Sequence, residues 1–493
     1  MKKKANQIAM LMLSFFIYFL SAGCSKKTAN QTPQPMPVVT PVTPLKSDVA
    51  IWLTNADKSQ LFSKQNISLN FAAGSNSNTT ISVDTTTTYQ TIDGFGFCLT
   101  GGSATMINSL SASQQTALLN ELFATDNSNI GISYLRITIG ASDLSASDFT
   151  YDDMQAGQTD VNLTSFSISH ELTDLVPVLK KILAINPNIK ILACPWTAPV
   201  WMKVNTTGNN GFSGGSLNTA YYDAYAAYFV KYIQAMQAQG ITIDAITPQN
   251  EPLNPSNNPA MVMQPIEEDN FVKNNLGPQF KTAGLATKII VYDHNPDRTD
   301  YPLLILADPV ANPFVDGSAF HLYTGSIDAL GPVHNAYPNK NIYFTEQYTA
   351  STGGFAGDLS WHISNLIVGA TKNWSRNVLE WNLATDASFG PHTNGGCSTC
   401  QGAITVNGSA VARNVSYYII AHASKFVRPG AVRIASTDQS ALALPNVAFK
   451  NTDGSKVLIV LNSSNVPQTF NIQFNGKIVS TSLNGGSVAT YVW

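Results

Sequence analysis

The sequence predicts an α/β fold: a (β/α)8 TIM barrel with an attached β-sandwich domain built from N- and C-terminal segments. Three observations support this prediction. Eight apolar runs of strand length alternate with longer helical patterns between residues 90 and 428. Short strand patterns stand before and after this region. No G-x-G-x-x-G motif opens a helix and no Walker-type lysine loop is present, which disfavours an open nucleotide-binding sheet.

The barrel prediction depends on the order of strand-like and helix-like segments. The apolar runs cover residues 91–97, 133–140, 189–196, 241–251, 288–295, 318–325, 341–347 and 377–386. Helical patterns are found at residues 111–124, 170–185, 221–240, 360–374 and 411–426. Strands that alternate with helices at this pitch indicate parallel βα units. Eight such units are the number that closes a TIM barrel.

The β-sandwich is predicted from alternating strand patterns at both ends of the chain, since the two ends of a compact domain can lie close together. These patterns occupy residues 67–73, 81–84, 456–464, 468–474 and 486–493. The predicted divisions are a signal peptide at 1–23, a lipidated Pro/Thr-rich linker at 24–45, N-terminal sandwich strands at 46–89, the barrel at 90–428 and the C-terminal sandwich at 429–493.

The first residues predict export. Three lysines at positions 2–4 precede an apolar stretch from Ile8 to Leu20, which is too short for a comfortable membrane span. Small residues directly before Cys24 resemble a bacterial lipoprotein cleavage box. We therefore expect Cys24 to be lipidated, so that the protein is anchored to a bacterial membrane, at the cell surface or in the periplasm, only through this lipid. Simple secretion is the alternative.

Composition and charge narrow the possible partners. The 493 residues are 44 % hydrophobic, enough for a large core, and the formal net charge is −3. Charged residues make up 12 % of the chain, about half of the usual share of roughly 25 %. Without a basic field, nucleic acid is not expected as a partner. The polar surface suits a neutral, hydroxyl-rich ligand.

The cysteines predict one disulfide and no metal site. Cys397 and Cys400 form a C-x-x-C pair in a Gly/Ser/Thr-rich loop, with no second pair or histidine set nearby to complete a zinc site. In an oxidising compartment they are a disulfide candidate. Cys98 and Cys194, at the ends of apolar runs, are expected to be packed free thiols.

Two glutamates stand at predicted strand ends. Glu251 ends the fourth run, in ITPQNEP, and Glu346 ends the seventh, in YFTEQ. In a TIM barrel the chemistry lies at the carboxyl ends of the strands, so these side chains are expected to face each other across the mouth. Two carboxyl groups separated by roughly 5.5 Å are the equipment for hydrolysing a glycosidic bond with retention of configuration. A single glutamate would more often be a surface residue or an ion-pair partner.

A series of short motifs resembles glycoside hydrolase family 30, in clan A, which includes glucosylceramidases, β-1,6-glucanases and xylan-cleaving enzymes. The motifs are QTIDGFG, YLRITIGASD, CPWTAPVWMK, TPQNEP, YDHN, HLY, FTE, EWNLATD and SKFVRPGAVRI, in this order. The resemblance implies a retaining hydrolase with no cofactor, with Glu251 as acid/base and Glu346 as nucleophile. It also implies that the sugar subsite is lined by Arg136, Asp143, Trp196, Asn250, His321, Tyr323 and Trp381.

Several of these roles have a physical reason of their own. Arg136 could keep the Glu346 carboxylate ionised, because a nearby cation lowers a carboxyl pKa, although a structural ion pair is the alternative. Tyr323 could hold Glu346 by a hydrogen bond. Glu251 must be protonated to act as an acid, so its pKa is expected to be raised. His294 and His422 are interpreted as structural histidines.

The tryptophans and the acidic loop residue have competing explanations. Trp196 and Trp381 offer flat faces for a pyranose ring, and core packing is the alternative. Asp143 could accept hydrogen bonds from sugar hydroxyl groups or close an Asx turn.

The expected function is hydrolysis of an extracellular β-glucan, as an endo-β-1,6-glucanase. A glucosylceramidase-like exo-β-glucosidase or a β-xylosidase is the alternative enzyme. The alternative outside catalysis is a surface lipoprotein that only binds glycans.

Overall fold

The computed structural model describes residues 46–493. The predicted signal peptide, the lipidation site Cys24 and the linker up to residue 45 lie outside the described residues. Within residues 46–493, no helix is long and apolar enough to cross a membrane.

Eight parallel strands close into a barrel, which confirms the predicted fold class. They are β4 (Gly94–Leu99), β5 (Tyr134–Thr138), β6 (Lys190–Cys194), β9 (Ala245–Ile246), β10 (Lys288–His294), β11 (Val315–His321), β12 (Asn341–Glu346) and β14 (Ser375–Asn382). Each pairs with its neighbours in chain order, and β14 pairs with β4 to complete the ring. Each strand overlaps one of the predicted apolar runs.

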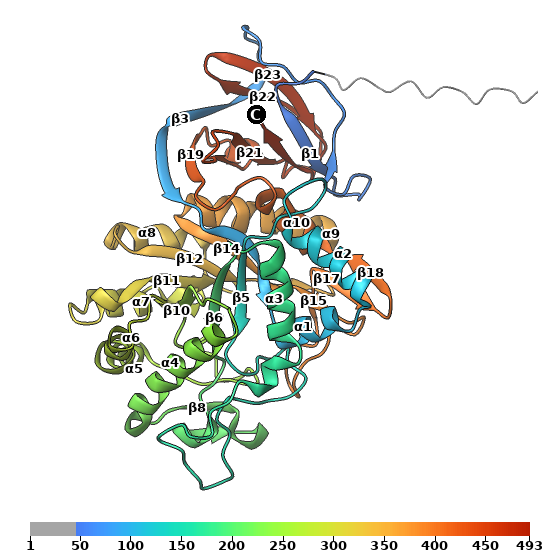
Figure 1. Ribbon diagram of the computed structural model, residues 1–493. Coiled ribbons are helices and arrows are strands. Elements are labelled where there is room, and N and C mark those ends of the chain that lie inside the picture. The colour runs from blue at the N-terminus through green and yellow to red at the C-terminus, as the bar shows by residue number, and fades with distance from the viewer. Residues whose placement is uncertain (1–45) are drawn as a thin grey trace, which may run out of the picture. The chain divides into compact units, whose positions relative to one another are not determined.

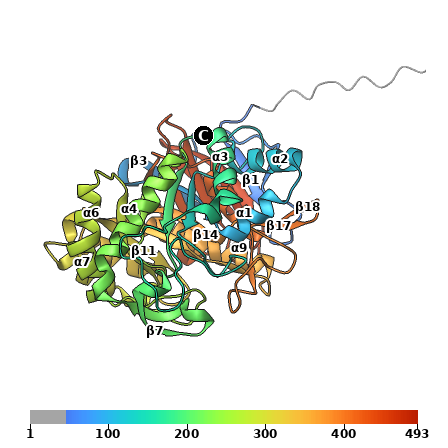
Figure 2. The ribbon, with the colours of Figure 1, turned by 60° about the horizontal axis from the view of Figure 1, so that its bottom comes forward.

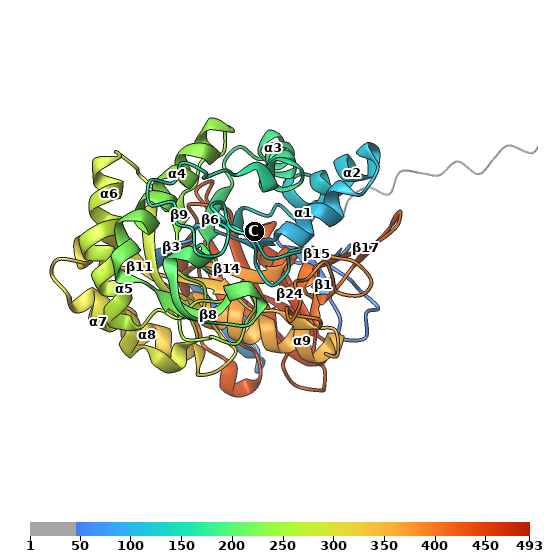
Figure 3. The same ribbon diagram turned by 90° about the horizontal axis from the view of Figure 1, so that it is seen from below.

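Helices surround the barrel on its outside, as the view from below shows (Figure 3). They are α1 (Gly101–Asn108), α2 (Ala112–Phe123), α3 (Leu175–Ile185), α4 (Tyr222–Ala238), α5 (Pro265–Phe271), α6 (Gly277–Thr282), α7 (Asp300–Ala307), α8 (Leu330–Ala336), α9 (Phe355–His362) and α10 (Val415–Ser424). Helix α9 continues as a π-helix over Ile363–Ala370. The predicted helix from residue 411 begins too early, since Ala410–Arg413 forms strand β18.

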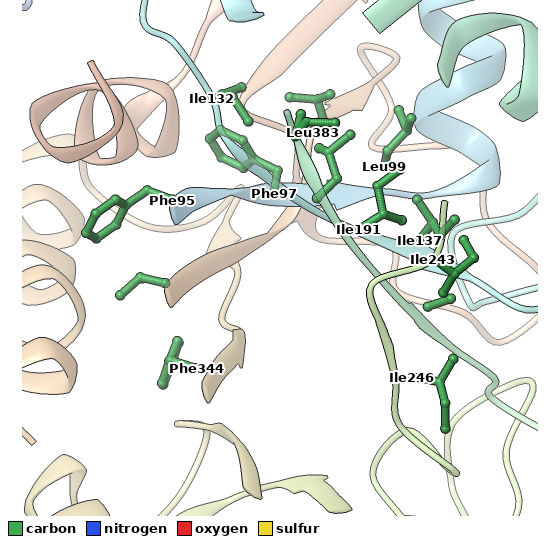
Figure 4. Close-up of a cluster of buried hydrophobic side chains, with 14 of the residues drawn as sticks. Phe95, Phe97, Leu99, Ile132, Ile137, Ile191, Ile243, Ile246, Phe344 and Leu383 are labelled. Carbon is green, nitrogen blue, oxygen red and sulfur yellow. The ribbon is translucent and has the colours of Figure 1, made fainter. Parts of the chain in front are cut away.

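Successive side chains along the barrel strands point alternately outward and inward, and they pack into two separate cores. Phe95, Phe97 and Leu99 of β4 lie in an outer cluster of buried hydrophobic residues (Figure 4). This cluster also contains helix residues such as Leu118 and Leu179. The opposite faces of the strands form a smaller cluster inside the barrel, made of Tyr134, Leu192, Ala245, Ile290, Ala319, Tyr343 and Leu379. Residues two positions further along a strand face the same side. Arg136, two residues after Tyr134, therefore lies above this inner cluster, toward the carboxyl ends of the strands.

Short strands in the loops beyond these carboxyl ends were not predicted. Strands β7 (Lys203–Thr207) and β8 (Ser213–Leu217) form one antiparallel ribbon, and β13 (Thr349–Ala350) pairs with β16 (Cys400–Gln401). A third sheet contains β15 (Ala384–Thr385), β17 (Ile404–Asn407) and β18.

The remaining strands build the sandwich from both ends of the chain, as predicted, but the strand predicted at residues 67–73 is absent, and this segment makes only an isolated bridge between Ala72 and Ile478. The order of the sandwich strands is β2-β1-β24-β21-β20-β19-β3-β22-β23, and Figures 1 and 2 both show the blue N-terminal strands beside the red C-terminal ones. Their bounds are β1 (Ala50–Thr54), β2 (Ser63–Lys64), β3 (Thr79–Thr91), β19 (Val432–Ser436), β20 (Asn446–Lys450), β21 (Lys456–Leu461), β22 (Gln468–Phe474), β23 (Lys477–Leu483) and β24 (Val488–Val492).

Strand β3 connects the two layers of the sandwich. Residues 79–82 pair in parallel with β22, and residues 83–91 pair with β19 in the other layer. One apolar cluster fills the space between the layers, with Ile81, Leu458, Phe470 and Tyr491 fully buried in it. The chain then passes from β3 directly into β4, the first strand of the barrel.

His422 joins the barrel to the sandwich. It lies in α10, is fully buried, and places its two ring nitrogens 2.9 Å from Thr490 Oγ1 in β24 and 2.8 Å from Thr54 Oγ1 in β1. Burial lowers the pKa of His422 from 6.5 to about 3. Both ring nitrogens have partners, as expected of a structural histidine.

We predict that His422 makes unfolding depend on pH. Its pKa is lower in the folded protein than in the unfolded chain, so the unfolded chain binds the proton first as the pH falls. The stabilisation is therefore complete above about pH 6.5 and is lost toward about pH 3. In this window the unfolding free energy should fall by about 1.4 kcal/mol per pH unit through His422 alone. Denaturant titration at several pH values measures this slope.

His422→Gln is the matched control, because a glutamine amide can still hydrogen-bond threonine but does not titrate. The slope for the wild-type protein should exceed the slope for the variant by the amount given above. Equal slopes for the two proteins would contradict the prediction.

Candidate active site

A cavity of about 620 Å³ opens at the carboxyl ends of the barrel strands. Both predicted catalytic glutamates line it, together with polar and aromatic side chains from several loops. The lining residues are Asp143, Glu251, Leu253, Asn254, Ser256, Asn257, His294, Asn295, Tyr323, Glu346, Tyr348, Trp381, Cys397 and Cys400. The cavity therefore has the position that a TIM-barrel active site requires.

Glu251 and Glu346 meet at this cavity. Glu346 is the last residue of β12, while Glu251 follows the short strand β9 in a left-handed conformation with φ 43°. One oxygen of each carboxyl group and one ring nitrogen of His321 all lie within 4.8 Å of one another. The two carboxyl groups are thus close together, as in a retaining glycosidase, where the two groups lie roughly 5.5 Å apart.

Two donors fix the Glu346 carboxyl group. Arg136 Nη1 donates to Oε2 at 2.5 Å, and the Tyr323 hydroxyl donates to Oε1 at 2.9 Å. Arg136 is fully buried, and its guanidinium lies 4.9 Å from the ring centroid of Trp196 and 5.6 Å from that of Trp381. The side chain of Glu346 is thus held at a fixed position with one edge open to the cavity.

A different set of groups holds Glu251. Its Oε1 lies 3.1 Å from His321 Nδ1 and 4.0 Å from His294 Nε2, and Asn254 Nδ2 donates to its Oε2 at 2.8 Å. Its backbone N–H donates to the carbonyl oxygen of Asp293 at 3.0 Å. Asn254 was not among the residues predicted from the sequence.

Asp293 is the residue that connects the two sets, and sequence reasoning missed it. Its carboxylate lies 2.7 Å from Arg136 Nη2 and 3.1 Å from His321 Nε2, and it is fully buried. The hydroxyl groups of Thr247 and Thr345 donate to it at 2.8 and 2.6 Å. Both catalytic candidates therefore depend on one buried carboxylate.

A β-bulge explains why the strand pattern concealed Asp293. Alternation from Ile290, which faces the barrel interior, would place Tyr292 inside and Asp293 outside. The register shifts between Tyr292 and His294, and residues 292 and 293 have φ values of 80° and 63°. Tyr292 consequently packs in the outer cluster and Asp293 faces inward. The backbone amide of Tyr292 donates to the buried carboxylate of Glu268 at 3.1 Å. A bulge beside a functional site commonly redirects a side chain in this way.

The pKa shifts of the two glutamates are opposite to the expectation from the sequence. Burial raises the pKa of Glu251, but the hydrogen bond from His321 and the charge on that ring outweigh burial and lower the pKa to about 2. Burial raises the pKa of Glu346 despite the nearby charges of His321 and Arg136. Burial lowers the pKa of His321, but the carboxylates of Glu346, Asp293 and Glu251 raise it to about 9. The expectation for Glu251 failed because the sequence does not show its contact with His321, and the expectation for Glu346 failed because burial outweighs the charges of His321 and Arg136.

The residues predicted to line the sugar subsite fall into two groups. Asp143, Tyr323 and Trp381 line the cavity. The other four are not among the lining residues, and all are nearly or fully buried: Arg136, Trp196, Asn250 and His321. Asn250 Oδ1 accepts a hydrogen bond from Arg136 Nη2 at 2.7 Å, and the Trp196 ring lies 5.1 Å from that of Trp381. In this structure these four residues support the residues that line the cavity.

Asp143 combines exposure to the cavity with an unusual environment. Its Oδ1 atom is buried and has no hydrogen-bond partner among the described residues. Burial, together with the charges of Glu346 and Glu251, raises the pKa of Asp143 to about 8. A hydroxyl-rich ligand could supply the missing partner.

His294 was wrongly interpreted as a satisfied structural histidine. It lines the cavity near Glu251, and its buried Nδ1 atom has no partner among residues 46–493. Its position directly after Asp293 in the YDHN motif was the available signal. Tyr348, two residues after Glu346, also lines the cavity and was not predicted to do so.

Glu251, His321 and Glu346 are also the residues of the described chain that could together hold a metal ion. Their ligand atoms already have partners in the protein, because both ring nitrogens of His321 contact carboxylates and Arg136 contacts Glu346. The carboxyl groups of Glu251 and Glu346 border the same cavity, and each is held by its own hydrogen-bond donors. This arrangement matches the requirements of acid/base and nucleophilic chemistry at an acetal.

A closed (β/α)8 barrel with this pair at its mouth defines a glycoside hydrolase. The Glycosyl hydrolase family 30 TIM-barrel domain matches residues 92–427, and the Glycosyl hydrolase family 30 beta sandwich domain matches residues 430–491. The chain therefore belongs to glycosyl hydrolase family 30.

Individual relatives agree with this assignment. An endo-1,6-β-D-glucanase of Aspergillus fumigatus is 38 % identical over 413 residues, which cover 79 % of this chain and 82 % of the relative. The lysosomal acid glucosylceramidase of Mus musculus is 29 % identical and covers 82 % of this chain and 81 % of the relative. The solved structure of an endo-β1,6-glucanase superimposes with a TM-score of 0.85 at 38 % identity, covering 91 % of this chain and 99 % of the other.

Proposed function

We propose that this chain is an endo-β-1,6-glucanase that hydrolyses extracellular β-glucan with retention of configuration. The similarity to endo-1,6-β-glucanases exceeds the similarity to the mouse glucosylceramidase, which favours the glucan. The observation that carries the proposal is the separation of at most 4.8 Å between one oxygen of Glu251 and one of Glu346. This distance leaves no room for a water molecule between an acid and a base, so direct attack by a carboxylate is favoured.

The proposed reaction has two steps. Glu346 attacks the anomeric carbon and forms a glycosyl-enzyme ester while Glu251 protonates the departing oxygen. Glu251 then removes a proton from the water molecule that hydrolyses this ester. Arg136 and Tyr323 hold the two oxygens of Glu346 in place throughout. A fixed nucleophile lowers the entropic cost of reaching the transition state.

The neighbouring side chain of His321 can supply the proton that Glu251 donates. His321 is protonated at neutral pH, because its pKa is raised to about 9, and its Nδ1 lies 3.1 Å from Glu251 Oε1. His321 lowers the pKa of Glu251, and Glu251 is one of the carboxylates that raise the pKa of His321, so transfer of the proton to Glu251 removes these mutual contributions. We propose that the acid form of Glu251 arises by this transfer when substrate fills the cavity.

The cavity offers groups suited to a sugar ring. Trp381 presents an aromatic side chain, and Asp143 and Tyr323 present oxygen atoms. An apolar ring face and a few placed hydrogen-bonding groups are the usual composition of a small-molecule site. A protein that only bound glycan would not need a buried nucleophile opposite a proton donor, so binding without catalysis is disfavoured.

We also propose that the protein is an exported lipoprotein, attached to the membrane through Cys24. The support is the basic, apolar and small-residue sequence of positions 2–24. Mass spectrometry of the membrane fraction should find the mature protein with acyl chains on Cys24, and Cys24→Ser should abolish the modification. An unmodified N-terminus in a soluble fraction would instead indicate simple secretion.

The substrate can be identified with purified enzyme and a panel of β-1,6-, β-1,3- and β-1,4-glucans, glucosylceramide and aryl β-xyloside. We expect turnover of β-1,6-glucan, with a range of oligosaccharides appearing early. Release of glucose alone would indicate exo action, and preference for glucosylceramide or xyloside would select an alternative enzyme. Glu346→Gln should reduce kcat by at least about 10⁴-fold, because the nucleophile is lost. A near-normal rate would exclude Glu346 as the nucleophile.

The pH dependence tests the supply of a proton by His321. In the wild-type enzyme the His321–Glu251 pair loses its last proton near the pKa of His321, about 9, so kcat/KM should fall above this pH. In His321→Gln the only remaining proton is that of Glu251, whose pKa lies well below 9. The alkaline limb of kcat/KM should therefore move to lower pH by about 2 units or more. An unchanged alkaline limb would refute this supply of the proton, and Tyr323→Phe serves as a control that keeps His321.

A further inference from the structure

We propose that the loop closed by the Cys397–Cys400 disulfide is a wall of the substrate cleft, and that its oxidised form is needed for tight binding of glucan. This inference rests on the proposed function. We call residues 393–401 the disulfide loop. The structure joins its two cysteines by a disulfide bond. Both cysteines line the same cavity as Glu251 and Glu346.

The disulfide packs against the aromatic side of the cleft. Cys397 and Cys400 share an apolar cluster with Leu144, Trp381 and Tyr348, and Cys400 is 3 % exposed. Sulfur is soft and polarisable, so it extends the apolar surface of Trp381 toward the cavity. A sugar ring that packs on Trp381 would therefore also lie near the disulfide.

The loop is attached directly behind the nucleophile. Strand β13 begins three residues after Glu346 and pairs with β16, so that Ala350 lies opposite Cys400. Ser351 donates its backbone N–H to the carbonyl oxygen of Thr399 at 2.8 Å. Tyr348, between Glu346 and β13, is consequently placed against the disulfide.

The same loop fixes Asp143, the acidic residue of the cavity. The backbone N–H of Thr393 donates to the carbonyl oxygen of Asp143 at 2.9 Å. A side chain at position 396 would approach this oxygen to 2.3 Å, so only Gly396 allows the contact. The backbone N–H of Cys397 faces the Asp143 carboxylate and counteracts part of the rise in its pKa.

A third attachment reaches the segment that follows Glu251. Thr393 Oγ1 donates to the carbonyl oxygen of Asn258 at 2.6 Å, and Asn258 Nδ2 donates to that of Asn394 at 2.9 Å. The cavity-lining residues Leu253 and Asn254 belong to the same segment. The disulfide loop thus ties together the loops that follow β5, β9 and β12, and it belongs to the segment after β14.

Opening the disulfide should weaken binding more than chemistry. The hydrogen bonds that hold the two catalytic carboxyl groups come from Arg136, Tyr323, His321 and Asn254, and none of these residues is in the disulfide loop. A flexible loop must be ordered each time glucan binds, and this ordering opposes binding. KM should therefore rise while kcat changes little.

A role in global stability alone would give a different result. The bridge spans a sequence separation of only 3 residues, and a short closed loop constrains the unfolded chain less than a long one does. Loss of folded enzyme would lower the apparent kcat and leave KM unchanged. The ratio of the two effects separates a binding wall from a stabilising bridge.

The experiment compares the enzyme before and after treatment with dithiothreitol. Dithiothreitol supplies two electrons and two protons, becoming a cyclic disulfide while Cys397 and Cys400 become thiols. The other cysteines of the described chain, Cys98 and Cys194, are free and buried, so one bond responds. We expect KM for β-1,6-glucan to rise about tenfold, with kcat within about twofold. Removal of the reductant followed by addition of oxidised glutathione, which takes up the two electrons and two protons and becomes two thiols, should restore KM.

Two further measurements make the result decisive. The Cys397→Ser/Cys400→Ser variant should show the raised KM and no response to dithiothreitol. Calorimetric titration of Glu346→Gln with a β-1,6-linked glucose tetramer reads affinity without turnover, and reduction should weaken it by about tenfold. Equal affinity and equal KM in both states would overturn the inference. Failure of the untreated enzyme to cleave β-1,6-glucan would instead overturn the proposed function.

Discussion

The ion pair between Arg136 and Asp293 is the interaction on which the rest of the site depends. Both side chains are fully buried and their charged atoms are 2.7 Å apart. Removing two charges from water is costly, and the cost is offset only when further hydrogen bonds satisfy the remaining atoms. Here Thr247, Thr345 and His321 contact the Asp293 carboxylate, while Glu346 and Asn250 accept hydrogen bonds from Arg136 Nη1 and Nη2. The buried Nε of Arg136 has no partner among residues 46–493. The pair thereby becomes a rigid base for both catalytic carboxyl groups.

The charge balance of this assembly explains its chemistry. Three carboxyl groups, on Glu251, Asp293 and Glu346, face two cations, on Arg136 and His321. The fully ionised set has one excess negative charge, which burial disfavours. This excess is consistent with the raised pKa of Glu346. Formation of an ester at Glu346 removes the negative charge of that carboxylate, so the covalent intermediate relieves an electrostatic cost present in the free enzyme.

The sequence allowed the fold and the meeting of Glu251 and Glu346 at the barrel mouth to be predicted, because both follow simple periodic rules. Apolar runs identify buried parallel strands, and the strand ends identify the mouth of a barrel. Glu251 and Glu346 were found in this way. The same rules predicted that the first and last strands share one sandwich.

Features that interrupt the regular alternation of side chains along a strand could not be predicted. Asp293 faces inward only because residues 292 and 293 adopt positive φ angles. The pattern of apolar and polar residues in the sequence does not show this change in the direction of the side chain. The pKa values of the glutamates depend on His321, which approaches them from a strand 70 residues from Glu251. Strand β18 and the ribbon of β13 and β16 are short, and their pairing is determined by tertiary contacts. These local departures from regular geometry are concentrated at the cleft, where function tolerates strain.

The pairing of β1 with β24 affects how the molecule can be made. Residues 50–54 hydrogen-bond to residues 488–492, almost the full length of the described chain away. A nascent polypeptide can complete most barrel units while still attached to the ribosome, but the first sandwich strand must wait for the last one to emerge. Until then β1 has an unpaired edge, which is a site for association with other chains. During synthesis this early strand must therefore be kept apart from other chains until β24 is available to pair with it.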